Sequence, residues 1–202
     1  MPIGPGGLDS NGIWQFGEDD SEALASDLLN LGMGSVSTAI STLGGVLQVV
    51  STTKTDATVI SVAAYSFTGN VSGLTVAITP SATSSKVKIE GVIVTARETS
   101  LPSGSLRIMR DSTPIGIGDA AGSRPRVTTS VFINVTSGTS SIAVPFSFID
   151  EPSTTSEVVY AIQLYNNDSA TRSFYFNRSP SDSDSGAHPR SISTITASEV
   201  AG

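Results

Sequence analysis

The alternation of apolar and polar residues is clearest in the stretch from Val71 to Val94. Apolar side chains alternate with small or polar ones on both sides of a polar break, at Leu74, Val76 and Ile78 before Pro80 and at Val87 and Ile89 after it. A period of two is typical of β-strands, and a break rich in Pro, Ser and Thr supplies a turn. The pattern predicts two strands joined by a loop as a β-hairpin.

The same pattern continues from Val46 almost to the C-terminus and predicts a mainly β fold. The expected strands are Val46–Ser51, Val59–Phe67, Leu74–Thr79, Lys86–Ala96, Ser105–Arg110, Thr113–Gly118, Val127–Val135, Ser140–Phe148, Val158–Asn166, Arg172–Asn177 and Ser191–Glu199. The breaks contain Gly, Pro, Ser, Asn and Asp, which favour turns. No crossover helix separates the strands, so the sheets are expected to be antiparallel. Short strands at this spacing favour a jelly-roll-like antiparallel β-sandwich over residues 46–202.

A helical pattern precedes the strands. Asp20 or Ser21 can cap a helix, and Glu22 adds a favourable charge to its first turn. Apolar residues then step by four and three residues alternately, at Leu29, Met33, Val36, Ile40 and Leu43. This spacing forms a seam between neighbouring helices. It is compatible with a short bundle made by several copies and with one amphipathic helix lying on its own β-domain.

Residues 1–20 precede this short α-helical segment and are expected to form an extended arm. They are rich in Gly and Pro and contain two aromatic residues, Trp14 and Phe16. A large aromatic side chain in a polar arm often fills a pocket on a partner. The alternative is that Trp14 folds back onto its own domain. The predicted organisation is thus an N-terminal docking segment, residues 1–45, followed by a β-domain.

The net charge of −7 is concentrated in the N-terminal segment. Residues 1–45 contain no Lys or Arg, and their acidic residues are Asp9, Glu18, Asp19, Asp20, Glu22 and Asp27. Nucleic-acid binding requires a basic footprint, so this distribution argues against a nucleic-acid partner. It favours docking on a basic protein surface, through Trp14, Phe16, Glu18, Asp19 and Asp20. The acidic residues are equally suited to keeping the arm soluble.

Two further properties of the sequence narrow the functional classes. There is no cysteine, so disulfides and thiolate metal sites are not available. No apolar run approaches the roughly 18 residues that span a bilayer, and no basic segment precedes an apolar run near the N-terminus. We therefore expect a soluble, unprocessed chain without membrane insertion.

Each candidate catalytic or cofactor-binding motif in this sequence lacks a residue or an element that its chemistry requires. His188 is the only histidine, and no Gly-x-Ser-x-Gly motif accompanies it. Gly116–Ala121 fits a dinucleotide fingerprint, but Pro125 would interrupt the helix that this motif needs. A depolymerase would require a nucleophile or carboxylate signature that the sequence does not show. Neither enzymatic activity nor a cofactor is expected.

Asp182–Gly186 begins like a calcium-binding loop. Its third ligand position is occupied by Gly186, and Ser193 stands where a bidentate Glu would be required. The motif therefore fails and no metal is expected. A looser site formed by Asp182, Asp184 and backbone carbonyls remains an alternative.

Several phrases of the sequence resemble virion proteins of bacteriophages. In order along the chain, phrases that look like those of a phage fibre-type head domain are Val46–Asp56, Gly73–Lys86, Gly118–Arg124, Phe148–Pro152 and Arg190–Glu199. They span residues 46–202. Pro5–Trp14, Gly17–Asp20 and Ser26–Asn30 are similar to the starts of minor tail proteins of phages of actinobacteria and related hosts. The shaft repeat of long fibres is missing.

This resemblance implies a virion protein on the tail or capsid surface. Fibre heads commonly associate around a threefold axis, so the resemblance also implies a homotrimer, joined here along the helical seam. One implied function is a short fibre or minor tail protein whose arm docks on other virion proteins and whose head binds a host cell-surface glycan or protein. The other is a capsid decoration or head-fibre protein.

Exposed loops are the candidate contacts with a host receptor, because loops can present side chains that strands must bury. The candidate segments are Arg97–Ser103, Gly118–Arg126 and Asn177–Arg190. In the last one, the candidate receptor contacts are Arg178, Asp182, Asp184, His188 and Arg190. Tyr165 or Tyr175 could supply a stacking face. The alternative is that these loops are solvated connections and that Arg124 and Arg178 are structural partners of carbonyls or acids.

Overall fold

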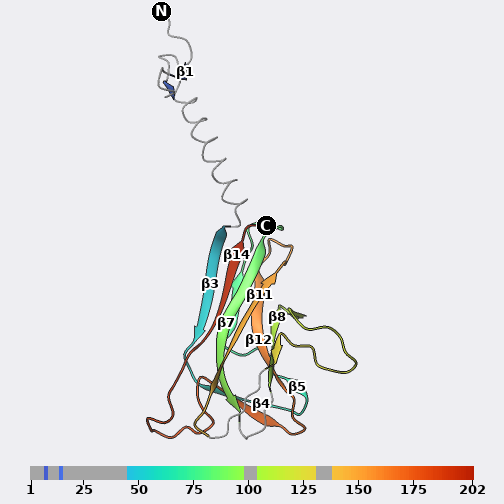
Figure 1. Cartoon of the computed structure of the whole chain (residues 1–202), viewed down its shortest axis with the longest axis vertical. Coiled ribbons are helices and arrows are strands. Elements are labelled where there is room, and N and C mark those ends of the chain that lie inside the picture. Colours follow the sequence, from blue (N-terminus) through green and yellow to red (C-terminus); the bar gives the residue numbers. More distant parts are fainter. Residues whose placement is uncertain (1–6, 9–13, 16–44, 98–103, 131–137) are drawn as a thin grey trace, which may run out of the picture. The chain divides into compact units, whose positions relative to one another are not determined.

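A computed structural model describes residues 7–8, 14–15, 45–97, 104–130 and 138–202 of the chain. The chain divides into two compact units, Met1–Gly45 and Val46–Gly202 (Figure 1). In the first unit, β1 (Gly7–Leu8) and β2 (Trp14–Gln15) pair antiparallel, with Leu8 opposite Trp14. The chain therefore turns back on itself between these two strands of the segment that was expected to be an extended arm. The expected helical segment lies outside the described residues. Within them, no helix could cross a membrane.

The second unit, which we call the head, contains two six-stranded antiparallel sheets in its described residues. The β7 sheet comprises β3 (Val46–Lys54), β4 (Thr58–Val62), β7 (Lys86–Arg97), β11 (Ile142–Asp150), β13 (Arg172–Phe176) and β14 (Ser193–Val200). The β12 sheet comprises β5 (Ser66–Phe67), β6 (Thr75–Ile78), β8 (Ser105–Arg110), β9 (Thr113–Ile115), β10 (Thr129–Ser130) and β12 (Val158–Asn166). The predicted mainly β fold with antiparallel pairing is confirmed.

Each sheet contains one long strand, and along one edge of it two shorter strands lie end to end. We call such a pair of shorter strands a row. Strand β7 pairs with β11 on one edge, and on the other edge with β14 and β13, which lie end to end. Strands β3 and β4 continue this arrangement, each beside one of those two. Strand β12 pairs with β8 on one edge and with β6 and β5 on the other. A loop can therefore leave a sheet at the junction between two strands that lie end to end.

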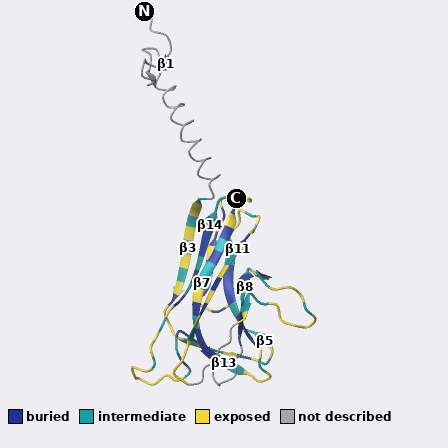
Figure 2. Cartoon of the chain, in the orientation of Figure 1, coloured by how far each residue is buried: buried dark blue, intermediate teal, exposed yellow. Residues whose placement is uncertain are grey.

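Alternating side chains of both sheets form one hydrophobic core. Ile89 and Ile93 of β7 are fully buried, as are Tyr160 and Ile162 of β12, and all four belong to the same cluster. Figure 2 shows this burial along the central strands. Burial of apolar surface stabilises a fold by about 25 cal/mol per Å². The side chains that the predicted alternation directs into this core therefore stabilise the head.

The hairpin predicted between residues 71 and 94 is not formed. Strand β6 pairs with β12, whereas β7 pairs with β11, β13 and β14, so the two predicted partners lie in different sheets. The segment between them crosses from one sheet to the other. Glu199 of β14 holds this crossing, because its carboxylate accepts hydrogen bonds from the backbone N–H and the hydroxyl of Ser81, both at 2.6 Å.

The strand predicted from Val59 to Phe67 is also divided. Strand β4 ends at Val62, and β5 belongs to the other sheet. The buried amide of Asn166 fixes the break, because its nitrogen donates to the carbonyls of Val62 and Ala63, both at 3.0 Å. Tyr65 lies within the break at a φ of 51°. This left-handed conformation is incompatible with a continuous strand.

Most other predicted strands differ from the observed ones by one to three residues at an end. The expected strands Thr113–Gly118 and Val127–Val135 also have different limits. The strand expected to reach Gly118 ends at Ile115 because Gly116 has a φ of 56°, outside the β region. Of the strand expected from Val127 to Val135, the structure describes only the two-residue β10 and no residue beyond Ser130 up to position 137.

Polar side chains also link the two sheets. Asp150 of β11 is buried and accepts hydrogen bonds from Arg110 of β8, at 3.0 and 3.1 Å, and from the Tyr160 hydroxyl, at 2.7 Å. Burial raises the pKa of Tyr160, and the bond to Asp150 raises it further, so this phenol remains a donor. Asp168, which follows β12, pairs with the fully buried Arg97 of β7.

We predict that Glu199→Gln destabilises the head in a pH-dependent way. Burial alone would raise the pKa of Glu199, but hydrogen bonds from Ser81, Ser85 and Gln48 outweigh it and lower the pKa to about 2. The carboxylate therefore stabilises fully above its ordinary pKa of 4.5, and this contribution is lost as the pH falls towards 2. We expect the variant to lose about 2–3 kcal/mol of unfolding free energy at neutral pH.

Urea unfolding followed by circular dichroism at several pH values measures this effect. The difference between Glu199→Gln and wild type should shrink as the pH falls from 4.5 towards 2. The exposed Glu157 provides a matched control, and Glu157→Gln should change little. A Glu199→Gln difference that stays constant with pH would contradict the assignment.

Candidate functional site

A long loop, residues 178–192, leaves the β7 sheet between β13 and β14. Its two ends are close together, because Phe176 faces Thr95 and Thr194 faces Val92 on the same strand β7. The loop is therefore an insertion in one row of strands. We call it the distal loop.

The distal loop lies at the end of the head away from Val46. Strand β14 runs from Ser193, which faces Lys54, to Val200, which faces Val46. Figure 1 shows the start of β3 and the C-terminus at one end of the head and the distal loop at the other.

Asn177 closes the neck of the distal loop. It is fully buried at a φ of 59°, a conformation that asparagine tolerates better than most residues. Its amide nitrogen donates to the carbonyls of Lys54 and Asp56, both at 2.9 Å. Its amide oxygen accepts a hydrogen bond from the Ser193 hydroxyl at 2.6 Å. One side chain thus ties the base of the loop to the junction between β3 and β4.

Asp182 brings two of the predicted contact residues together. Its carboxylate lies 3.3 Å from Nη1 of Arg178 and 2.5 Å from Nη2 of Arg190. The side chains of Asp182 and Arg190 are 41% and 54% exposed, so solvent weakens their pairing. The bridge therefore shapes the loop more than it stabilises the fold.

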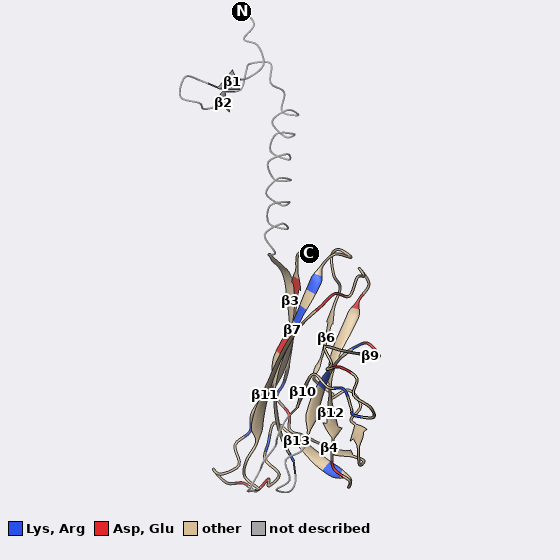
Figure 3. Cartoon of the chain, turned by 45° about the vertical axis from the view of Figure 1, so that its right-hand side comes forward, with Lys and Arg blue, Asp and Glu red and all other residues tan. Residues whose placement is uncertain are grey.

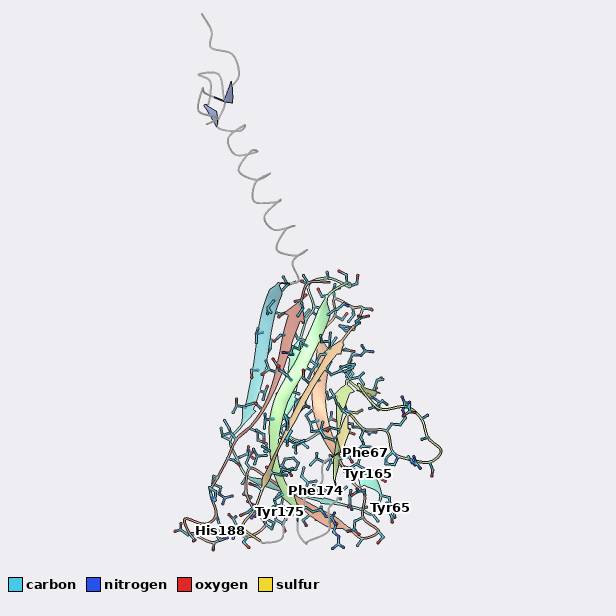
Figure 4. The ribbon with its side chains drawn as sticks, viewed as in Figure 1. Tyr65, Phe67, Tyr165, Phe174, Tyr175 and His188 are labelled. Atoms are coloured by element: carbon cyan, nitrogen blue, oxygen red, sulfur yellow. The ribbon has the colours of Figure 1, made fainter. Side chains whose placement is uncertain are left out.

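The distal loop forms an open polar pocket of about 260 Å³, lined by Asp182, Ser183, Asp184, Ser185, His188 and Arg190. Figure 4 shows His188 in the distal loop, and Figure 3 shows charges of both signs there. The structure therefore brings four of the five predicted receptor contacts around one pocket. Two of its lining residues, Ser183 and Ser185, were not predicted, because serine is common in every turn of this chain.

Arg178, the fifth predicted contact, is engaged in the structure of the loop. Its guanidinium carbon lies 4.8 Å from the centre of the Tyr175 ring. Its Nη1 faces the carbonyls of Ser179 and Pro180 at 3.4 and 3.3 Å, and its side chain is only 14% exposed. These contacts fit the alternative interpretation of Arg178 as a structural partner.

The side chains that line the pocket can both donate and accept hydrogen bonds. Two carboxylates accept, a guanidinium donates, and serine hydroxyls do either. His188 Nδ1 lies 3.0 Å from the Ser183 hydroxyl, a serine–histidine pair of the kind that hydrolases use. However, the other ring nitrogen, Nε2, is buried and has no hydrogen-bond partner among the described residues, so no carboxylate orients the ring. The geometry suits binding of a polar ligand.

The other loops predicted to contact a receptor differ from the distal loop. Arg97 is fully buried against Asp168, and residues 98–103 lie outside the described part of the chain. The loop from Gly118 to Arg126 is exposed and closed at its base, where Arg126 Nε donates to the Gly118 carbonyl at 2.6 Å.

The docking and seam residues can be placed only in part. The backbone of Trp14 lies in β2, while Phe16, Glu18, Asp19 and Asp20 lie outside the described residues. So do the seam residues Leu29, Met33, Val36, Ile40 and Leu43. No group of three or more His, Asp or Glu side chains within the described ranges could hold a metal ion.

No protein-family model matches this chain, and a search of curated proteins finds no match to it either.

We predict that the amide of Asn177 is required for the neck of the distal loop. Asn177→Ala removes three hydrogen bonds from buried groups and leaves an alanine at positive φ, so it should lower the unfolding free energy by about 3–4 kcal/mol. Asn177→Gly should cost about 1 kcal/mol less, since glycine accepts this φ. Urea unfolding measures both changes. Asn167, which is exposed, is the control, and equal losses for Asn167→Ala and Asn177→Ala would refute the role.

Proposed function

We propose that this protein is a structural protein of a bacteriophage virion, a short fibre or minor tail protein. Residues 1–45 dock it on other virion proteins, and the head faces the host cell. The ordered resemblance of phrases along residues 46–202 to phage fibre-type heads supports this proposal. The division of the chain into units at Gly45 and Val46 is compatible with a separate docking segment.

In this proposal the head is a jelly-roll-like sandwich. Both sheets contribute to a single core cluster, which is the arrangement of a sandwich. The chain also passes between the sheets repeatedly, for example from β4 to β5 and from β6 to β7. Such crossings are typical of sandwiches in which successive strands alternate between two sheets.

The observation that carries the proposed function is the polar pocket of the distal loop, at the end of the head opposite Val46. A protein attached through its N-terminal segment presents this end to a second surface. Asp184, His188 and Arg190 line the pocket, and their polar atoms suit the hydroxyl groups of a cell-surface glycan or the polar groups of a protein. The position of the pocket supports the proposal of a receptor-binding fibre.

The docking segment is proposed to form a homotrimer through the helical seam. Its six acidic residues and lack of basic ones favour a basic surface on the particle. Three copies would present three distal loops at one end, so weak contacts with a host surface would add up through multivalency.

The receptor role predicts that the pocket residues control adsorption. Replacing Asp184, His188 and Arg190 together by alanine should lower the affinity of the folded protein for host cells at least about tenfold, or 1.4 kcal/mol. Binding of labelled protein to host cells measures this. The same replacement of Asp119, Arg124 and Arg126 in the other exposed loop is the matched control. Unchanged adsorption with the pocket variant would instead favour a capsid decoration protein.

The role of the N-terminal segment predicts different results for two truncations. Removing residues 1–20 should leave a trimer that no longer enters particles, because the aromatic and acidic docking residues are lost. Removing residues 1–45 should also abolish the trimer and leave a folded monomeric head, because the seam is lost. Sedimentation and quantification of protein in purified particles measure the two properties. Normal incorporation after removal of residues 1–20, or a monomeric full-length chain, would contradict the assignment.

A further inference from the structure

A second surface with binding chemistry lies on the outer face of the β12 sheet. Four of its side chains belong to facing strands, because Phe67 pairs with Tyr165 and Arg107 pairs with Gln163. Their neighbour Leu164 in β12 points into the core, so these four side chains lie on the opposite face of the sheet, where Tyr165 is buried beneath its neighbours. We call them, together with Asn70, the outer cluster: Phe67, Asn70, Arg107, Gln163 and Tyr165.

The outer cluster forms a continuous row of contacts. The rings of Phe67 and Tyr165 have centroids 4.8 Å apart, and the guanidinium carbon of Arg107 lies 3.5 Å from the Phe67 centroid. Arg107 Nε and Nη2 donate to Gln163 Oε1 at 2.9 and 2.6 Å. Gln163 Nε2 donates in turn to Oδ1 of the exposed Asn70 at 2.8 Å. Each side chain orients the next, so the row is preorganised.

Tyr65 lies beside this row and exposes its ring. The residue is 62% exposed, and its φ is 51°. Tyr65 precedes Phe67 by two residues in the chain, and burial, with a smaller contribution from Tyr65, raises the pKa of Tyr165. Figure 4 shows Tyr65 on the same side of the head as Phe67 and Tyr165, and His188 on the other side. The surface is therefore separate from the pocket of the distal loop.

The backbone around Tyr65 is held firmly. The Tyr65 N–H donates to the Asp168 carbonyl at 3.2 Å, and the Ser66 hydroxyl donates to the Ala64 carbonyl at 3.1 Å. The other described non-glycine residues at positive φ are Asp111, Ser153 and Asn177, which are short and polar. A tyrosine in this conformation is unfavourable, and its exposed ring gains little burial in return. Strain that the fold maintains without a packing gain is typical of functional sites.

We propose that Tyr65 and the outer cluster bind a carbohydrate. One pyranose ring stacks on Tyr65, because the C–H groups of a sugar face carry positive partial charge and complement the negative face of an aromatic ring. Asn70 and the Arg107–Gln163 pair hydrogen-bond the hydroxyl groups of the same or the next sugar. A protein partner would require a larger apolar centre than one exposed ring provides. The inference does not depend on the virion role.

The test uses the full-length protein, with maltotriose, cellotriose and chitotriose as probes at millimolar concentration. At least one of them should bind, as measured by calorimetry or NMR titration. Tyr65→Asn removes the ring while keeping a residue that tolerates positive φ. We expect it to weaken binding at least about tenfold while the Tm stays equal or rises.

Three further variants separate this site from its alternatives. Gln163→Ala should also weaken binding, because it breaks the polar row. Ile149→Asn removes an exposed apolar side chain of the other sheet, and Asp119→Ala changes the exposed loop from Gly118 to Arg126; both should leave the affinity unchanged. Lack of binding by all three probes would overturn the proposal. So would a Tyr65→Asn variant with a lower Tm and unchanged affinity, because the ring would then be structural.

Discussion

Two buried asparagine amides determine where the rows of the β7 sheet break. Asn177 donates to the carbonyls of Lys54 and Asp56 before β4, and Asn166 donates to those of Val62 and Ala63 after it. A strand break inside a protein leaves backbone carbonyls without ladder partners, and each buried unpaired group costs about 1–3 kcal/mol. The amides supply the missing donors, so β4 can begin and end in the middle of the fold.

Both candidate binding surfaces emerge at these breaks. The distal loop leaves the sheet at Asn177, and the turn that carries Tyr65 follows the carbonyls bound by Asn166. Binding residues held by a rigid sheet need less ordering when a ligand arrives, so less binding free energy is lost. The structural role of the two amides is thus connected with the binding role proposed for the loops.

The ion pairs between the sheets serve a related purpose. Arg110 of β8 with Asp150 of β11 joins strands of different sheets, and Arg97 of β7 pairs with Asp168 in the segment after β12; these side chains are largely buried. Such pairs add little net stability compared with apolar packing, but loss of one partner leaves a buried charge. Hydrogen bonds from Arg172 and Arg97 also lower the pKa of Asp168 to about 2, although burial opposes this shift. The Asp168 carboxylate therefore stays ionised well into the acid range.

The sequence by itself determined which segments are strands. The limits of β8 and β12 agree with the predicted Ser105–Arg110 and Val158–Asn166, because alternation is a local property that each strand carries alone. It also located most of the polar residues of the distal-loop pocket, since charged side chains in a Ser-rich segment mark an exposed loop. Pairing was decided only by tertiary structure.

Strand β6 lacks its predicted partner because Glu199, far away in sequence, binds Ser81 and directs the chain to the other sheet. The break before β5 depends in the same way on Asn166. Tyr65 stood inside a predicted strand, where nothing in the pattern marks a positive φ. The row of side chains beside it comes from β5, β8 and β12, which are remote from one another in sequence, so only the folded chain could bring them together.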